Sequence, residues 1–183
     1  MSQIPFFCIR TSIDFKQREA RKTVPKPKKN SVKDAVAEWR KLVTSSTKKL
    51  YQLAKEAQTR SYSPYSKYPV GASVRSGRQF FAGTNVENAS YGATICAERV
   101  AIVTAVAAGH RRIDEICLVT SNSEGAAPCG MCLQVISEFS GPDTKLWIAN
   151  PKEILGLYRL KELFGFRFTK KDLKLKSKQA QRR

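Results

Sequence analysis

The chain has 183 residues, of which 42% are hydrophobic, and it carries a formal net charge of +18. This length suffices for one well-buried core and is too short for two comfortable domains. No apolar stretch reaches the roughly 20 residues that a membrane span requires, and the opening Ile4-Pro5-Phe6-Phe7-Cys8-Ile9 is too short and too proline-broken for a secretory signal. We therefore expect an intracellular protein that is neither secreted nor inserted in a membrane.

The positive charge is concentrated at the two ends of the chain. Residues 1–43 carry a net charge of +7, residues 44–169 carry +5, and residues 170–183 carry +6. The N-terminal arginines faintly match a mitochondrial presequence, and Asp14 and Glu19 dilute that match, so a cytoplasmic and a mitochondrial location both stay open. Basic arms of this kind stay solvated, act as targeting signals or bind nucleic acid through its phosphates.

The first boundary in the chain is a proline-rich linker, Val24-Pro25-Lys26-Pro27-Lys28-Lys29-Asn30, which cannot continue a helix. The boundary falls between this linker and Ser45. We divide the chain into a basic extension and linker over 1–43, one domain over 44–175, and a basic tail over 176–183.

Two amphipathic helices are predicted next. Ser31 caps a short run that reaches Trp39, and Ser46 caps a second helix. The core-facing residues of this second helix are Leu50, Leu53, Ala54 and Ala57. A rigid turn over 62–69 ends it, and two strands follow, around 70–75 and 79–86, joined by a hairpin at Ser76-Gly77.

Helices and strands alternate in the second half of the chain. A helix that starts at Cys96 and stops at Gly109 is apolar nearly all round, so we expect it to be buried. A strand over 113–120, a helix over 130–139 and a strand over 145–149 follow. This alternation predicts a layered α/β domain whose sheet is covered on both faces.

Three of the five cysteines cluster in the pattern of a metal site. Cys96 opens one buried helix, and Cys129 and Cys132 open another, one helical turn apart. Thiols at helix N-termini have lowered pKa values, because free backbone N–H groups favour negative charge there. Three protein ligands leave one tetrahedral position open, as in a catalytic zinc site, and Glu98 lies close enough to act on its occupant.

Simpler interpretations of the cysteines stay open at this point. A lone C-x-x-C is common, and it also fits a redox pair or half of a structural site with four ligands. His110, the only histidine, follows the C-terminal end of a helix, where a fourth ligand would be badly placed, and we expect it in a surface loop. Cys8 lies on the extension, and Cys117 sits in an apolar strand, where an inert buried thiol is expected.

Four blocks of sequence resemble the small homotetrameric cytidine deaminases. They are "YSPYSKYPVGA" (62–72), "GTNVENASYGATICAERVAI" (83–102), "PCGMCLQVISEF" (128–139) and "KELFGFRFTKKDL" (161–173). Cys-Ala-Glu followed by Pro-Cys-x-x-Cys is the three-cysteine form of the zinc deaminase signature. The resemblance implies a three-layer α/β/α domain with a central mixed sheet, and one zinc ion per subunit held by Cys96, Cys129 and Cys132.

The resemblance also implies a reaction. Zinc lowers the pKa of a bound water toward about 7, and the resulting nucleophile attacks C4 of cytosine in cytidine or deoxycytidine. Glu98 would be the catalytic proton carrier, from the water to N3 and then to the departing ammonia. Arg99 would offset the excess negative charge of three thiolates, since hydrogen bonds to ligand sulfurs withdraw charge from the metal.

By the same resemblance, six residues bind substrate. Asn85 and Glu87 would hold the ribose hydroxyls, and Tyr68 would line the base pocket. The family's substrate-binding positions also include Ala97, Tyr91 and Phe168 here. Tyr91 and Phe168 are expected to reach the site of a neighbouring subunit, so that the homotetramer completes each active site.

Three positions depart from the family pattern. Leu133 stands where an arginine usually follows the last cysteine, Ala127 replaces a small hydroxyl residue, and Gly165 stands where proline is common. None of them is a ligand position. Reduced turnover is compatible with these changes, and loss of zinc is not implied.

Two functions of different class follow from these observations. In the first, the protein deaminates free cytidine and deoxycytidine in pyrimidine salvage. In the second, the deaminase fold is a subunit of an RNA–protein particle such as a ribosome, anchored by its basic ends, and an enzyme acting on cytosine within nucleic acid lies between them. Intact ligands and Glu98 favour catalysis, whereas the charge of +18 favours an RNA partner.

Overall fold

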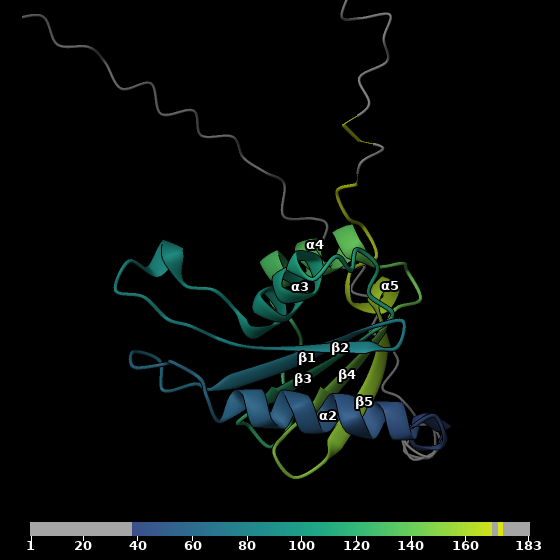
Figure 1. Ribbon diagram of the computed structural model, residues 1–183, viewed down its shortest axis with the longest axis horizontal. Helices are drawn as coiled ribbons and strands as arrows, with labels where there is room; N and C mark the ends of the chain where they lie inside the picture. The colour runs from purple at the N-terminus through teal and green to yellow at the C-terminus, as the bar shows by residue number, and fades with distance from the viewer. Residues whose placement is uncertain (1–37, 170–171, 174–183) are drawn as a thin grey trace, which may run out of the picture.

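The fold is a five-stranded sheet with helices on both faces (Figure 1). This computed structural model describes residues 38–169 and 172–173. The helices and strands, in chain order, are α2 (Ser45–Gln58), β1 (Val70–Ser76), β2 (Gln79–Thr84), the 3₁₀ turn η2 (Tyr91–Ala93), α3 (Ala97–Ala107), β3 (Glu115–Thr120), α4 (Gly130–Phe139), β4 (Lys145–Ala149), β5 (Ile154–Arg159) and α5 (Leu160–Leu163).

The sheet is mixed, with strand order β2-β1-β3-β4-β5. The β1 strand pairs antiparallel with β2 and with β3, β4 pairs antiparallel with β5, and β3 and β4 are parallel. Because parallel neighbours need a crossover, α4 connects β3 to β4 across one face of the sheet. The predicted three-layer arrangement with a central mixed sheet is confirmed.

Helix α2 lies on one face of the sheet, and α3 and α4 lie on the other (Figure 1). Two glycines let the helices approach closely. A Cβ atom on Gly71 of β1 would lie 2.0 Å from the backbone oxygen of Ala54 in α2, and one on Gly83 of β2 would lie 2.3 Å from the backbone nitrogen of Ala101 in α3. Glycine is therefore required on both faces for the layers to pack.

Helix α2 begins one residue before the predicted cap. Thr44 is the N-cap, its hydroxyl accepts a hydrogen bond from the backbone nitrogen of Thr47, and the Thr47 side chain bonds back to the Thr44 nitrogen. The prediction that Ser46 caps this helix is wrong, because Thr44 makes the reciprocal capping box and Ser46 becomes helical. The predicted run that Ser31 begins lies largely outside the described residues.

Helix α3 is less buried than its composition predicts. Ala101, Ile102 and Ala105 are fully buried against the sheet, whereas Val103 is 50% exposed. The prediction that this helix is buried on all sides is therefore wrong, since only one face contacts β1 and β2. His110, which follows α3, is also half-buried, with its Nδ1 3.2 Å from the Ser76 hydroxyl.

In the described part of the chain, no helix is both long and apolar enough to cross a membrane.

Strand β2 ends at Thr84 and β3 begins at Glu115, so both strands are shorter than predicted. Val86 leaves the sheet and bridges to Tyr62 and Ile95, which brings the segment before Cys96 back toward the start of β1.

Candidate active site

Three cysteines meet where α3 and α4 begin. Cys96 is the N-cap of α3, Cys129 is the N-cap of α4, and Cys132 follows in the first turn of α4. Their sulfur atoms all lie within 4.8 Å of one another, and the Cys96 and Cys129 sulfurs are 4.0 Å apart. Thiolates on a tetrahedral zinc ion are separated by roughly 3.8 Å, so these three fit one ion with its fourth position open.

The electrostatics of the cluster favour a metal cation. Hydrogen bonding from the Cys132 thiol, assisted by Arg99 and Cys129, lowers the pKa of Cys96 to about 5. The same hydrogen bond, together with burial, raises the pKa of Cys132. Cys96 is thus the more acidic partner of its hydrogen bond with Cys132, and a divalent cation bound by all three cysteines would require all three as thiolates.

Glu98 is a buried carboxyl group beside this cluster. It lies in the first turn of α3 and is 3% exposed. Burial raises the pKa of Glu98, and the nearby Cys96 raises it further. A carboxyl group with a raised pKa is suited to take up and return a proton near neutral pH.

Arg99 points its guanidinium group at the first cysteine. Its Nη2 donates to the backbone oxygen of Thr94 at 2.9 Å and lies 3.8 Å from the Cys96 sulfur. The Thr94 contact fixes the guanidinium beside the sulfur and so places a positive charge next to the thiol cluster.

A cavity of about 410 Å³ opens beside Cys96, Cys129 and Glu98. Its other walls come from the turn before β1, from β1 and β3, and from the loops after β2 and β3. The lining residues are Ser66, Tyr68, Val70, Asn85, Glu87, Thr94, Ile95, Cys96, Glu98, Leu118, Thr120, Ala126, Ala127 and Cys129. The structure thus brings Tyr68, Asn85, Glu87 and Glu98 to the wall of one cavity.

Asn85 holds the cavity wall in place through its own side chain. The Asn85 Oδ1 accepts from the Ser61 hydroxyl at 2.6 Å and from the Val70 nitrogen at 2.8 Å, and its Nδ2 donates to the Tyr68 oxygen at 3.0 Å. One N–H of the Asn85 amide remains available for a ligand.

Glu87 fixes the same wall through the turn that precedes β1. Its carboxylate accepts from the backbone nitrogens of Tyr65 and Ser66, at 2.9 and 3.1 Å, and from the Ser66 hydroxyl. The Ser66 hydroxyl and then the two backbone donors lower the pKa of Glu87, so it stays ionised. A carboxylate has about four acceptor positions, and three are used here, so one is left for a ligand in the cavity that Glu87 lines.

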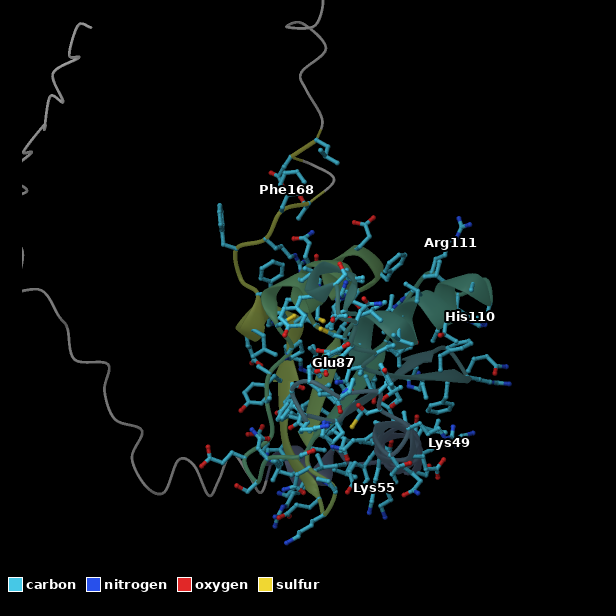
Figure 2. All side chains as sticks on the ribbon, turned by 90° about the vertical axis from the view of Figure 1, so that its left-hand side faces the viewer. Lys49, Lys55, Glu87, His110, Arg111 and Phe168 are labelled. Atoms are coloured by element: carbon cyan, nitrogen blue, oxygen red, sulfur yellow. The ribbon has the colours of Figure 1, made fainter. Side chains whose placement is uncertain are left out.

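Three predicted substrate residues do not line this cavity. Ala97 is fully buried in the core, Tyr91 is 76% exposed, and Phe168 is 58% exposed. Figure 2 shows Phe168 on the C-terminal segment, well away from Glu87. Tyr91 lines a neighbouring cavity of about 400 Å³ with Tyr65, whose ring packs edge-on against it with centroids 6.0 Å apart.

Sequence reasoning missed several residues of the cavity wall. Val70, Leu118 and Thr120 lie on β1 and β3, and Ala126 lies in the loop before α4. These side chains give no local signal of a site, because only the pairing of β1 with β3 brings the strand residues together. Of the three departures from the family pattern, Ala127 lines the cavity, Leu133 is 9% exposed in the core, and Gly165 follows α5.

The fold and the thiol cluster define an α/β protein with an open metal site. Residues 44–147 match the family described as "Cytidine and deoxycytidylate deaminase zinc-binding region". The cytidine deaminase of Sporosarcina psychrophila is 35% identical over 132 residues, which cover 72% of this chain and 97% of that protein. The cytidine deaminase of Halalkalibacterium halodurans is 36% identical over 125 residues, covering 68% and 95%.

Solved structures agree with the sequence relatives. The crystal structure of cytidine deaminase from Burkholderia pseudomallei superposes with a TM-score of 0.62 at 37% identity, covering 65% of this chain and 96% of that chain. The chain therefore belongs to the cytidine and deoxycytidylate deaminase family, whose members are zinc-binding hydrolases. Zinc is the cofactor that fits the cluster of Cys96, Cys129 and Cys132.

Proposed function

We propose that the protein hydrolyses the amino group of cytidine and deoxycytidine, giving uridine or deoxyuridine and ammonia, in pyrimidine salvage. The observation that carries this proposal is the buried Glu98 carboxyl group beside three clustered thiols in a cavity of about 410 Å³. Ligand cavities of this size hold a small molecule such as a nucleoside. The named activity of the relatives supports the same substrate class.

Each residue has a defined part in this reaction. Cys96, Cys129 and Cys132 hold the zinc ion, which supplies Lewis-acid activation of water when bound. Glu98 removes a proton from the water, carries it to N3 of cytosine, and protonates the departing ammonia. Arg99 offsets the negative charge of the three thiolates.

The remaining lining residues position the nucleoside. Tyr68 borders the base, and Asn85 and Glu87 hold the ribose hydroxyls with the donor and acceptor positions left over from their internal hydrogen bonds. Ala97 is fully buried and does not line the cavity, so its proposed substrate contact rests on the family resemblance alone. By holding the ribose at one end of the cavity, Asn85 and Glu87 orient C4 of the base toward the thiol cluster.

We also propose that the subunits form a homotetramer in which Tyr91 and Phe168 reach a neighbouring site. Both rings are exposed, and Val103, Met131 and Phe166 expose further apolar surface at 50%, 61% and 103%. Exposed apolar side chains on α3, α4 and the C-terminal segment are suited to subunit contact. We therefore expect Tyr91→Ala to lower activity in the tetramer. Light scattering after gel filtration measures the oligomeric state, and cytidine turnover measures the activity.

The basic ends support a contact with RNA or a ribonucleoprotein, in the cytoplasm or in mitochondria. Residues 1–37, 170–171 and 174–183 lie outside the described residues, so this proposal and the domain limits 1–43, 44–175 and 176–183 rest on sequence alone. A subunit with only a structural role in such a particle would not turn over cytidine.

The proposed activity is tested with the purified chain and the variant Glu98→Gln. Zinc per chain is measured first, and loss of cytidine absorbance is then followed. The wild type should turn over cytidine, and the variant should be slower by roughly 10²–10⁴-fold with zinc retained, because only the proton carrier is removed. A zinc-loaded wild type that turns over neither cytidine nor deoxycytidine would refute the proposed function.

A further inference from the structure

Helix α2, which lies on the face of the sheet opposite α3 and α4 (Figure 1), carries three lysines, of which Lys48 and Lys49 are exposed and Lys55 is half-buried. Lys48 and Lys55 are seven positions apart, so they lie two helical turns apart on the same side of the helix. A cleft of about 390 Å³ lies at the start of α2. It is lined by Lys49 of α2 and by Arg78 of the β1–β2 hairpin, together with the hydroxyl residues Ser45 and Ser46. We call Lys48, Lys49, Lys55 and Arg78 the α2 basic face.

The α2 basic face has no internal counter-charge. Within residues 38–169, none of its four side chains lies within ion-pair distance of a carboxylate. The only acidic residue of α2, Glu56, accepts a hydrogen bond from Gln52 at 2.9 Å. Several other cations of the domain are paired, as Arg75 is with Glu115 at 3.1 Å and Lys161 with Asp143 at 2.7 Å.

The face offers charge without apolar surface. Leu50 and Ala54 of α2 are fully buried against the sheet, and none of the large exposed apolar side chains falls within Ser45–Gln58. The Lys49 ammonium lies 4.7 Å from the centre of the Phe80 ring. This cation–π contact positions the charge over the ring. A helix that enters a membrane surface needs a strongly exposed apolar face, and no large apolar side chain of α2 is in the exposed class.

We propose that the α2 basic face binds the phosphate backbone of nucleic acid. Unpaired cations at a surface gain most from a polyanion, because each phosphate contact releases condensed counterions. The basic N-terminal extension is joined in sequence to the start of α2, so its positive charges are tethered to one end of this face. None of the four residues lines the cavity beside Glu98, so this binding is separate from deamination.

The test compares two triple variants of the full chain that remove the same amount of charge. The first is Lys48→Gln, Lys49→Gln and Lys55→Gln, and the second is Arg111→Gln, Arg112→Gln and Lys161→Gln. Figure 2 shows Lys49 and Lys55 projecting from one side of the domain, with Arg111 on the other side. Both variants keep the basic ends, whose contribution therefore cancels in the comparison.

Binding of a labelled single-stranded RNA, and of a duplex DNA with the same number of phosphates, is measured by anisotropy over a range of salt concentrations. For the RNA, the α2 variant should reduce the slope of log K against log salt by about 2, because each phosphate that is no longer neutralised removes about 0.7 from the slope. The control variant should keep a slope close to that of the wild type, and the DNA should show the same ranking because bases are not read.

Equal weakening of binding in the two variants would overturn the proposal, since net charge alone would then explain binding. An unchanged slope in the α2 variant, or tighter binding to anionic lipid vesicles than to RNA, would also overturn it. Cytidine turnover is measured on the same samples and should be unaffected by either variant. Absence of turnover in all samples refutes the proposed function and leaves the binding result intact.

Discussion

Each end of the α3–α4 helix pair borders a cavity, and the two cavities differ in what converges on them. At the N-terminal ends, the cavity of about 410 Å³ contains Cys96, Cys129 and Glu98. At the C-terminal ends, a larger cavity of about 570 Å³ is lined by residues 111–114 and 138–144. The larger cavity has charged walls, but several of these charges are paired, as Arg112 is with Asp114 and Asp143 with Lys161.

The difference shows that helix polarity, rather than cavity size, locates the site. Free backbone N–H groups at a helix start favour thiolates, whereas the carbonyl groups at a helix end do not. In the described part of the chain, the three cysteines are the only group of potential metal ligands whose atoms all converge. The N-terminal ends therefore hold reactive groups that the C-terminal ends lack, and three substitutions test this contrast.

The largest effect is expected from Cys129→Ser at the N-terminal end. Its side chain is exposed, so the substitution leaves the core intact, while the ligand set falls from three thiols to two. We expect zinc per chain to fall from one toward zero, and cytidine turnover to fall with it, as measured by metal analysis and absorbance.

Cys117→Ala provides the matched control. Cys117 is fully buried on β3, and burial raises the pKa of its thiol, which keeps it protonated and inert. Zinc content should stay at one per chain in this variant. Loss of zinc in Cys117→Ala, or retention of zinc and activity in Cys129→Ser, would contradict the assignment of the N-terminal ends as the metal site.

A smaller effect is expected from Arg99→Gln. The substitution removes the guanidinium that lies 3.8 Å from the Cys96 sulfur, and Leu133, buried in the core, supplies no second cation. Outer contacts of this kind are worth about 10–100-fold in metal affinity or activity. Competition with a zinc chelator measures the affinity, and Arg99→Lys, which keeps the charge but loses the planar fork, should fall in between.

Elements that carry a local signal were predicted from the sequence, and an edge strand without one was not. The helix over 130–139 and the strand over 145–149 have the predicted bounds, because glycine and apolar periodicity mark them locally. Strand β5 (Ile154–Arg159) was not predicted. It contains Gly156 and an exposed Tyr158 and pairs only at the edge of the sheet, with a register shift between Ile148 and Ala149.

Within the site, spacing along one helix could be predicted from the sequence, and contact across strands could not. The convergence of Cys96, Cys129 and Cys132 follows from two helix starts, which the sequence marks with cysteine, proline and glycine. The internal hydrogen bonds of Asn85 to Ser61, Val70 and Tyr68 depend on the return of the chain after β2, and no local pattern encodes that return.

The smallest effect is expected at the C-terminal ends, from Ser140→Ala. Ser140 follows α4 and borders the larger cavity, and its hydroxyl oxygen is buried with no hydrogen-bond partner. Removing an unsatisfied buried hydroxyl should raise the free energy of unfolding by about 1 kcal/mol, measured by urea denaturation. Zinc content and cytidine turnover should not change. A fall in turnover with the fold intact would show that the C-terminal ends take part in the reaction, and the contrast between the two ends would fail there.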